Sequence, residues 1–216
     1  MADNKSEIYA EKKAHYFQGI RPEVVALIPG TNNRIIELGC GAGQTLLGAR
    51  EAGKASEIVG IDIIDRLPQH ALLTRYYQGD IDSLPLDMEH ESFDVALCAD
   101  ILEHLVDPWS TLRRLSLLLK PGGTLIVSLP NARNYTLALR LLFFGDFQYQ
   151  SDGLLDKGHL RFFCKKNMMH LIRQAGFQVV RADFRLQKLR KVFYFLSFGL
   201  AEQFLVKQYL ISARKV

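Results

Sequence analysis

The sequence predicts an α/β domain whose doubly wound, mostly parallel sheet is covered by helices on both faces. Two observations lead to this prediction. Short runs of Val, Ile and Leu recur along the chain, and segments with the apolar spacing of helices alternate with them. Strands that read as continuous apolar runs are typical of parallel sheets buried on both faces. The chain of 216 residues, 48% of them hydrophobic, has the size and composition of one globular domain.

The expected elements follow one another from the N-terminus. Residues 1–28 are expected to be helical, because Pro22 suits a first helical turn and apolar residues follow it. The apolar runs predict strands at 34–38, 57–62, 93–100, 124–130, 177–184 and 204–215. Helices are predicted at 44–53, around 66–75, from the end of the run at 93–100 to about 119, and at 165–177. A turn is expected at 120–123, and residues 131–158 are expected to form a long insertion.

Composition and charge narrow the class of protein. The net charge of +4 is too small to indicate a nucleic-acid partner. Cys40, Cys98 and Cys164 include no close pair, which argues against a disulfide framework and favours the reducing cytoplasm. The N-terminus lacks the apolar segment of a secretory signal, and the longest apolar patches, at 137–145 and 192–201, fall short of the roughly 20 residues that span a bilayer. We expect a cytoplasmic protein with at most a peripheral membrane contact.

A glycine cluster follows the first predicted strand, in the stretch "IIELGCGAGQTLL". Gly39, Gly41 and Gly43 allow positive φ and a close approach of other atoms to the backbone, which indicates a bound ligand. The dinucleotide fingerprint G-x-G-x-x-G would place glycine at Gln44, so the pattern departs from it. Glu37 would repel a pyrophosphate but attract an ammonium or sulfonium group. An NAD-dependent oxidoreductase is therefore the least favoured alternative.

The segment "ELGCGAG" resembles motif I of the class I S-adenosylmethionine-dependent methyltransferases. Three further segments match that family in order, namely "GIDI", "GDIDSLPL" and the pair "FDVALCADILEHLVDP" and "LKPGGTLIVSLPN". The resemblance implies one methyltransferase domain over residues 1–216, S-adenosylmethionine as cofactor, and a Rossmann-like seven-stranded sheet with an antiparallel last strand. It implies that Asp62 binds the ribose hydroxyls and that Asp80 meets the adenine amino group. The cofactor-binding residues expected on this basis are Glu37, Gly39, Cys40, Gly41, Gly43, Asp62, Ile63, Asp80, Ile81 and Ala99.

His104 and His159 are the candidate catalytic residues. Asp100, Glu103 and His104 have the spacing of one helical face, near the sheet edge where ligands bind. They resemble the E-x-x-E-H pattern of some small-RNA and quinone-pathway O-methyltransferases, with Asp100 in place of the first Glu. Three roles stay open for them: support of the cofactor edge, a general base, or a metal site with His159 as a further ligand. No metal ligand is assigned.

The segment "DKGHLRFFCKKNMMHLIRQAGF" resembles a later part of the same family. His159 and Arg161 would face the acceptor, although a plain helix-entry turn is an alternative. Cys164 stands where the family has the Thr that caps the helix, so a looser helix start is expected because thiols cap poorly.

The sequence says less about the molecule that accepts the methyl group. Residues 131–158 are expected to be a lid over the substrate, with aromatic side chains that suit a ring, a sugar face or an isoprenoid tail: Tyr135, Phe143, Phe144, Phe147 and Tyr149. The stretch at 185–200 interleaves cations with aromatic residues, so it is expected to pack on the sheet or a second subunit, or to lie on a membrane. We expect methylation of a small molecule at a hydroxyl oxygen by a monomer or homodimer, without nucleic acid. The main alternative is a methyltransferase-like subunit that binds cofactor without catalysis.

Overall fold

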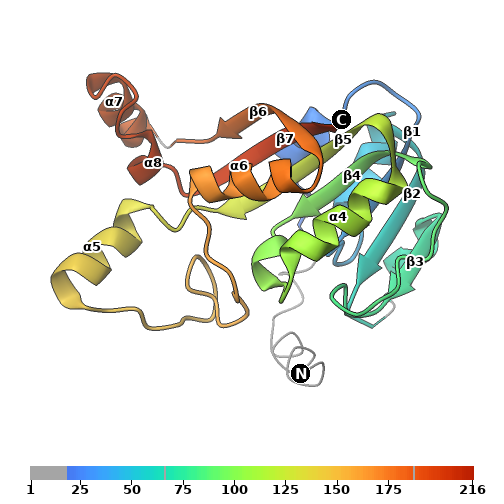
Figure 1. The fold of residues 1–216 in the computed structure, drawn as a ribbon, viewed down its shortest axis with the longest axis horizontal. Helices are drawn as coiled ribbons and strands as arrows, with labels where there is room; N and C mark the ends of the chain where they lie inside the picture. The colour runs from blue at the N-terminus through green and yellow to red at the C-terminus, as the bar shows by residue number, and fades with distance from the viewer. Residues whose placement is uncertain (1–18, 66, 187) are drawn as a thin grey trace.

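The protein is built on one twisted seven-stranded sheet, seen in a computed structural model that describes residues 19–65, 67–186 and 188–216 (Figure 1). The strand order is β3-β2-β1-β4-β5-β7-β6, and only β7 runs antiparallel to its two neighbours. The strands are β1 Asn33–Leu38, β2 Ala55–Asp62, β3 Arg75–Gln78, β4 Phe93–Ala99, β5 Leu119–Pro130, β6 Phe177–Phe184 and β7 Gln208–Lys215. This sheet confirms the predicted Rossmann-like class, including the antiparallel last strand.

Helices cover both faces of the sheet because successive strand residues point to opposite sides. Ile36 and Leu38 of β1 belong to one core cluster, which α4 (Pro108–Leu118) and α6 (Lys165–Gln174) cover. Ile35 belongs to a second cluster on the other face, covered by α2 (Pro22–Leu27) and α3 (Gln44–Glu51). Strand residues buried on both sides explain why the strands read as continuous apolar runs.

The chain switches direction across the sheet next to β1. It runs from β1 outward to β2 and β3, then returns to place β4 on the other side of β1. The register pairs Leu38 of β1 with Ile61 of β2 and with Cys98 of β4, so the carboxyl ends of these three strands lie together. Open α/β sheets bind ligands at such a switch point.

Several element boundaries differ from the sequence-based expectation. The helix expected around 66–75 is a short 3-10 turn, η2 (Pro68–Leu72), followed by β3, and residue 66 lies outside the described residues. The helix expected from the end of β4 to about 119 is divided into η3 (Leu102–His104) and α4. Pro108 begins α4 because its fixed φ suits a first turn, while Leu105 before it is extended.

The two ends of the chain also depart from expectation in part. Of the helix expected over 1–28, α2 with Pro22 in its first turn is confirmed, and residues 1–18 lie outside the described residues. The strand expected at 204–215 begins at Gln208, because Glu202–Leu205 form the short helix α8. The expected turn at 120–123 is part of β5.

The insertion at 131–158 contains one helix, α5 (Tyr135–Phe144), and a long loop after it. Asn134 caps α5 by accepting from the N–H of Thr136 at 3.2 Å. Together with α7 (Lys188–Leu196), α5 extends from one end of the molecule, beyond the ends of β5 and β6 (Figure 1). Within the described residues, no helix has both the length and the apolar character needed to cross a bilayer.

Candidate functional site

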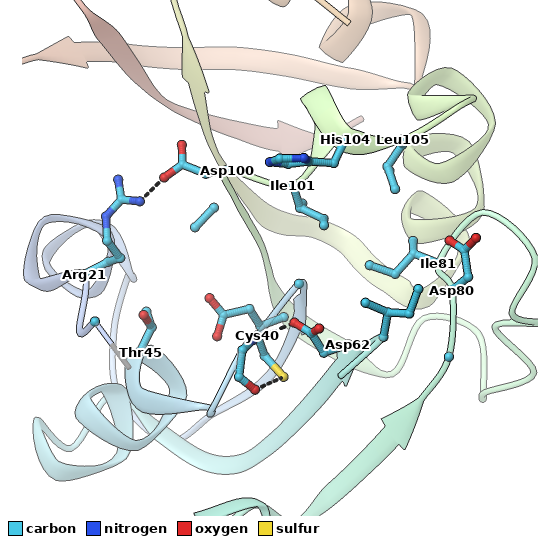
Figure 2. Close-up of a pocket in the computed structure, with 17 residues that line it drawn as sticks. Arg21, Cys40, Thr45, Asp62, Asp80, Ile81, Asp100, Ile101, His104 and Leu105 are labelled. Atoms are coloured by element: carbon cyan, nitrogen blue, oxygen red, sulfur yellow. Dashed lines mark hydrogen bonds and ion pairs between the residues drawn. The ribbon is translucent and has the colours of Figure 1, made fainter. Parts of the chain in front are cut away.

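A cleft lies at the carboxyl edge of the sheet, between β1, β2 and β4 (Figure 2). The expected residues that line it are Glu37, Gly39, Cys40, Gly41, Asp62, Ile63, Asp80, Ile81 and Ala99. Sequence reasoning missed further residues along its wall, namely Gly19, Arg21, Thr45, Gly79, Ile101 and Leu105. His104 also lines the cleft. The loops that follow neighbouring strands therefore meet at one site.

The glycine loop bends sharply where β1 ends. The N–H groups of Gly39 and Cys40 both donate to Ile61 O, at 2.8 and 3.2 Å, which fixes the loop against β2. Gly39 has φ +70°, and a Cβ there would lie 2.8 Å from the side chain of Ile101. The glycine is therefore needed both for its backbone conformation and for close packing.

Gly43 is the one expected cofactor residue that does not line the cleft. It precedes α3 with φ +79°, and a Cβ there would lie 3.0 Å from Leu73. Its positive φ and its packing against Leu73 are sufficient reasons for a glycine here, and its contact with a cofactor stays a prediction.

Glu37 presents a buried carboxyl group to the cleft. Its side chain is 2% exposed, and Oε2 has no hydrogen-bond partner among the described residues. Burial raises the pKa of Glu37 to about 8, and the nearby Asp62 carboxylate adds to the shift while Arg21 opposes it. A buried, unpartnered acceptor of this kind is suited to a cationic ligand group.

Asp62 is oriented by backbone N–H groups at the end of β2. Its Oδ2 accepts from the N–H of Gly41 at 2.7 Å, and its Oδ1 accepts from the N–H of Ile64 at 3.2 Å. Burial raises the pKa of Asp62, and these hydrogen bonds oppose that shift. Because each carboxylate oxygen has a second lone pair, the group can still accept from a ligand hydroxyl.

Arg21 and Asp80 lie at opposite ends of the cleft (Figure 2). Asp80 Oδ1 accepts from the N–H of Asp82 at 3.1 Å, which fixes the loop after β3. Arg21 donates to Asp100 and reaches Ser128 Oγ at 3.2 Å. Arg21 carried no recognisable motif signal in the sequence, because its partners are distant along the chain.

Asp100 does not share a helical face with Glu103 and His104, which corrects the expectation from spacing. It has φ +55°, and Leu102–His104 form only a single 3-10 turn. Its carboxylate accepts from Arg21 and from Ser128 Oγ, the latter at 2.9 Å. Asp100 therefore belongs to a polar network between α2 and the sheet.

His159 takes the place beside Glu103 and His104 instead. One potential ligand atom from each of the three residues lies within 4.8 Å of the others. His104 Nδ1 donates to Gly158 O and His159 Nδ1 donates to Leu154 O, both at 2.9 Å. With Nδ1 as donor to a carbonyl, Nε2 is the remaining nitrogen of each ring, and His159 Nε2 lies 4.0 Å from Glu103 Oε1.

Glu103 is the most deeply buried member of this cluster. It is 1% exposed, and its Oε2 has no hydrogen-bond partner among the described residues. Burial raises the pKa of Glu103. Burial also lowers the pKa of His104 to about 4, and the neighbouring His159 adds to this lowering. His104 is therefore neutral at physiological pH, and the cluster brings two imidazole rings and one buried carboxyl group together.

A second cavity of about 390 Å³ adjoins the cleft, and His104 and Asp100 line both. The rest of its wall is Glu103, Pro130, Asn134, Thr136, Gly153, Leu154, Asp156, His159, Lys207 and Gln208. The insertion supplies part of this wall through Asn134, Thr136, Gly153, Leu154 and Asp156, and none of the expected aromatic residues lines it. Phe143 and Phe144 are 69% and 80% exposed.

Arg161 is not brought to this cavity. Its Nη2 donates to Val106 O at 2.5 Å, so it ties the segment before α6 to the loop before α4. The expectation that it faces the acceptor is corrected. Cys164 precedes α6 and makes no capping hydrogen bond with its side chain, as expected.

Comparison with known proteins places the chain in a family. Residues 9–182 match the family model described as a methyltransferase domain. The chain belongs to the class I S-adenosylmethionine-dependent methyltransferases. It is 31% identical over 143 residues to the ubiquinone biosynthesis O-methyltransferase of Xanthomonas campestris pv. campestris (strain B100), an alignment that covers 61% of this chain and 58% of the relative. The match therefore spans little more than half the length of that methyltransferase.

Solved structures share the methyltransferase fold. The S-adenosylmethionine-dependent methyltransferase of Mesorhizobium loti aligns with a TM-score of 0.66 at 20% identity, covering 95% of this chain and 99% of that one. The [4+2]-cyclase SpnF aligns with a TM-score of 0.61 at 19% identity, covering 94% and 80%. At these identities the likeness concerns the fold alone.

The cleft fits the cofactor of this methyltransferase family. S-adenosylmethionine has a cationic amino group and a sulfonium, a ribose diol and an adenine. Glu37 offers an unpartnered buried acceptor, and Asp62 is held by two backbone donors. The donor set thus matches the chemistry of the cofactor, whereas a buried Glu37 disfavours a pyrophosphate.

Proposed function

We propose that this methyltransferase moves a methyl group to a hydroxyl oxygen of a small-molecule acceptor bound in the second cavity. The observation that carries the proposal is the cluster of Glu103, His104 and His159 at the junction of the cleft and the cavity. Methyl transfer from a sulfonium needs the acceptor aligned with the methyl group, and a hydroxyl must lose its proton. The cluster is located where such a proton would be removed.

The cofactor is held in this proposal by residues at the ends of β1, β2 and β4 and in the loops that follow β1, β2 and β3. Glu37 accepts from the amino group, Asp62 from both ribose hydroxyls, and Asp80 from the adenine amine. Gly39, Cys40 and Gly41 supply a backbone surface close to the ligand, because all three line the cleft. Ile63, Ile81 and Ala99 line the same cleft and complete the cofactor-binding surface.

The histidine cluster suits a divalent cation better than a lone general base. An imidazole whose pKa is about 4 is a weak proton acceptor at neutral pH, and the buried Glu103 oxygen lacks a partner. A bound divalent cation would lower the pKa of an acceptor hydroxyl. Nδ1 of each histidine donates to a backbone carbonyl. This hydrogen bond fixes the ring and leaves Nε2 as the nitrogen that would bind the cation.

The acceptor is proposed to be hydroxylated, either sugar-containing or quinone-like. Asn134, Thr136, Asp156 and Lys207 give the second cavity a polar wall. The relatives named as ubiquinone biosynthesis O-methyltransferases support the quinone-like class. The segment 131–158 is proposed to act as a lid, because it supplies part of that wall. A cytoplasmic location is proposed from the free cysteines Cys40, Cys98 and Cys164.

An acceptor screen that measures release of S-adenosylhomocysteine tests this function. We expect turnover with a hydroxylated acceptor, at least about a hundredfold loss in His104→Ala or His159→Ala, and unchanged affinity of these variants for S-adenosylhomocysteine. EDTA should abolish turnover and Mg²⁺ or Zn²⁺ should restore it.

His170→Ala, on the exposed side of α6, serves as the matched control. If no acceptor is turned over while the cofactor product still binds, the protein is the non-catalytic binding subunit. If NADH binds in preference, the oxidoreductase alternative holds.

A further inference from the structure

Exposed apolar side chains are concentrated at one end of the molecule. Of the 21 large hydrophobic residues exposed in the described chain, 14 lie in residues 139–149 or 192–204. We call these two segments the apolar end; they comprise most of α5 with the loop after it, and α7 through α8 (Figure 1). Phe198 is 95% exposed, Leu200 86% and Phe144 80%. Such a concentration of exposed large apolar side chains at one end of a protein indicates an interaction surface.

The two segments of the apolar end are fixed to each other at their bases. Arg190 of α7 donates to Leu205 O at 3.1 Å and to Tyr135 Oη at 3.3 Å, where α5 begins. Arg133 lies 4.6 Å over the ring of Phe204. Tyr194 faces the body of the protein through Phe184, at 5.7 Å between ring centroids, so Phe193, Phe195 and Leu196 remain on the exposed side.

Positive charge accompanies these apolar residues. Residues 131–149 and 185–207 contain seven Lys or Arg residues and two acidic ones, a net charge of +5, although the whole chain has only +4. Arg185, Lys191 and Lys207 are exposed, and Arg185 acts electrostatically on Glu23. From 185 to 201 the sequence has no acidic residue.

We propose that the apolar end docks this protein onto an anionic lipid bilayer. Aromatic and aliphatic side chains beside exposed cations are the combination that partitions into the interface of a bilayer with negative headgroups. Self-association fits less well, because a two-fold dimer through this surface would place its net positive charge against itself.

Docking would bring the bilayer close to the second cavity. Thr136 in the first turn of α5 lines that cavity, and Leu154 and Asp156 line it from the loop that follows. Phe147 of the same loop packs on Phe162, at 5.3 Å between ring centroids, and Phe162 lies 6.4 Å from His159. This arrangement favours an acceptor that carries a lipid tail, an inference that rests on the proposed function.

Flotation of the full chain with vesicles tests docking independently of methyl transfer. We expect flotation with vesicles of about 30% phosphatidylglycerol in phosphatidylcholine, little with phosphatidylcholine alone, and release in high salt. The triple variant Phe195→Ser, Leu196→Ser, Phe198→Ser should bind at least about tenfold more weakly. The double variant Leu72→Ser, Leu117→Ser changes residues 58% and 51% exposed elsewhere, and should float like the wild type.

Charge reversal tests the same proposal while leaving the apolar residues intact. Arg185→Glu with Lys191→Glu should reduce flotation with the anionic vesicles, whereas Lys166→Glu with Arg173→Glu on α6 should not. Unchanged binding of S-adenosylhomocysteine shows that each variant is folded. The proposal is overturned if the wild type does not float, if both charge pairs behave alike, or if light scattering shows a dimer that the triple variant dissociates while no vesicle binds.

Discussion

The buried carboxyl of Glu37 is the residue whose protonation the fold controls most clearly at the cofactor cleft. Its pKa of about 8 results from burial and from the neighbouring Asp62, so the empty protein holds it mainly protonated at neutral pH. A cationic amino group placed against it would stabilise the carboxylate and lower that pKa. Binding of the cofactor should therefore release a proton.

This linkage gives a pH dependence with a definite sign. Between pH 6 and 7.5 the affinity for S-adenosylhomocysteine should rise with pH, by at most about tenfold per unit, because the ionised form binds. Calorimetry in two buffers of different ionisation enthalpy measures the proton released. Glu37→Gln should release none and should bind with an affinity that is flat in pH; a wild-type-like slope in that variant would contradict the assignment.

Many residues that line the cleft could be predicted from their positions in the sequence. Others, such as Arg21, reach the cleft only through the fold. The positions of Gly39, Asp62 and Asp80 at the cleft could be predicted because each lies at or just after the end of a recognisable strand, and strand ends meet at one edge. Arg21 was missed because its partner Asp100 lies 79 residues away. Gly43 shows a limit of the sequence, because a glycine in a loop does not reveal whether packing or binding requires it.

At the scale of elements, helix ends explain both successes and errors. Gly53 follows α3 as expected, with φ +69°. The single helix expected after β4 is divided into η3 and α4, and Asp100, with φ +55°, precedes η3, so Asp100 and His104 do not share a helical face. Spacing along a sequence gives a common face only if the helix is continuous, and here one 3-10 turn and an extended residue intervene.

The start of α6 offers a test at this scale. Cys164 is in the extended conformation of a helix N-cap but makes no capping hydrogen bond. Cys164→Ser should raise the free energy of unfolding by about 0.5–1 kcal/mol, since a hydroxyl can accept from a free N–H of the first turn. Urea denaturation measures the change. Cys164→Ala, which cannot cap, is the control, and equal stability of the two variants would contradict the explanation.

The whole molecule is held together across the cleft by contacts far apart in sequence. Arg21 joins the start of α2 to Asp100 after β4 and to Ser128 of β5. The alternation of strands and helices predicted the class and the sheet, because buried strands impose apolar runs. The sequence could not predict this contact, because side-chain pairing between remote segments leaves no local pattern.

Loss of Arg21 should affect distant elements together. In Arg21→Gln we expect faster amide exchange in α2 and about tenfold weaker binding of S-adenosylhomocysteine, because a charged hydrogen bond across the cleft is lost. Hydrogen exchange and calorimetry measure the two effects. Arg50→Gln removes an exposed hydrogen bond to Leu72 O outside the cleft and should leave both unchanged. Equal effects of the two substitutions would contradict a specific role for Arg21.

The insertion of β7 between β5 and β6 has a consequence for biosynthesis. The ribosome makes β5 and β6 before β7, the strand that separates them. Until β7 is made, each of the two strands has one edge whose backbone N–H and C=O groups lack their hydrogen-bond partners. The half of the sheet from β3 to β5 can assemble while translation continues, but the far edge closes only once residues 208–215 have emerged. During that interval the nascent chain exposes strand edges that chaperones would shield from aggregation.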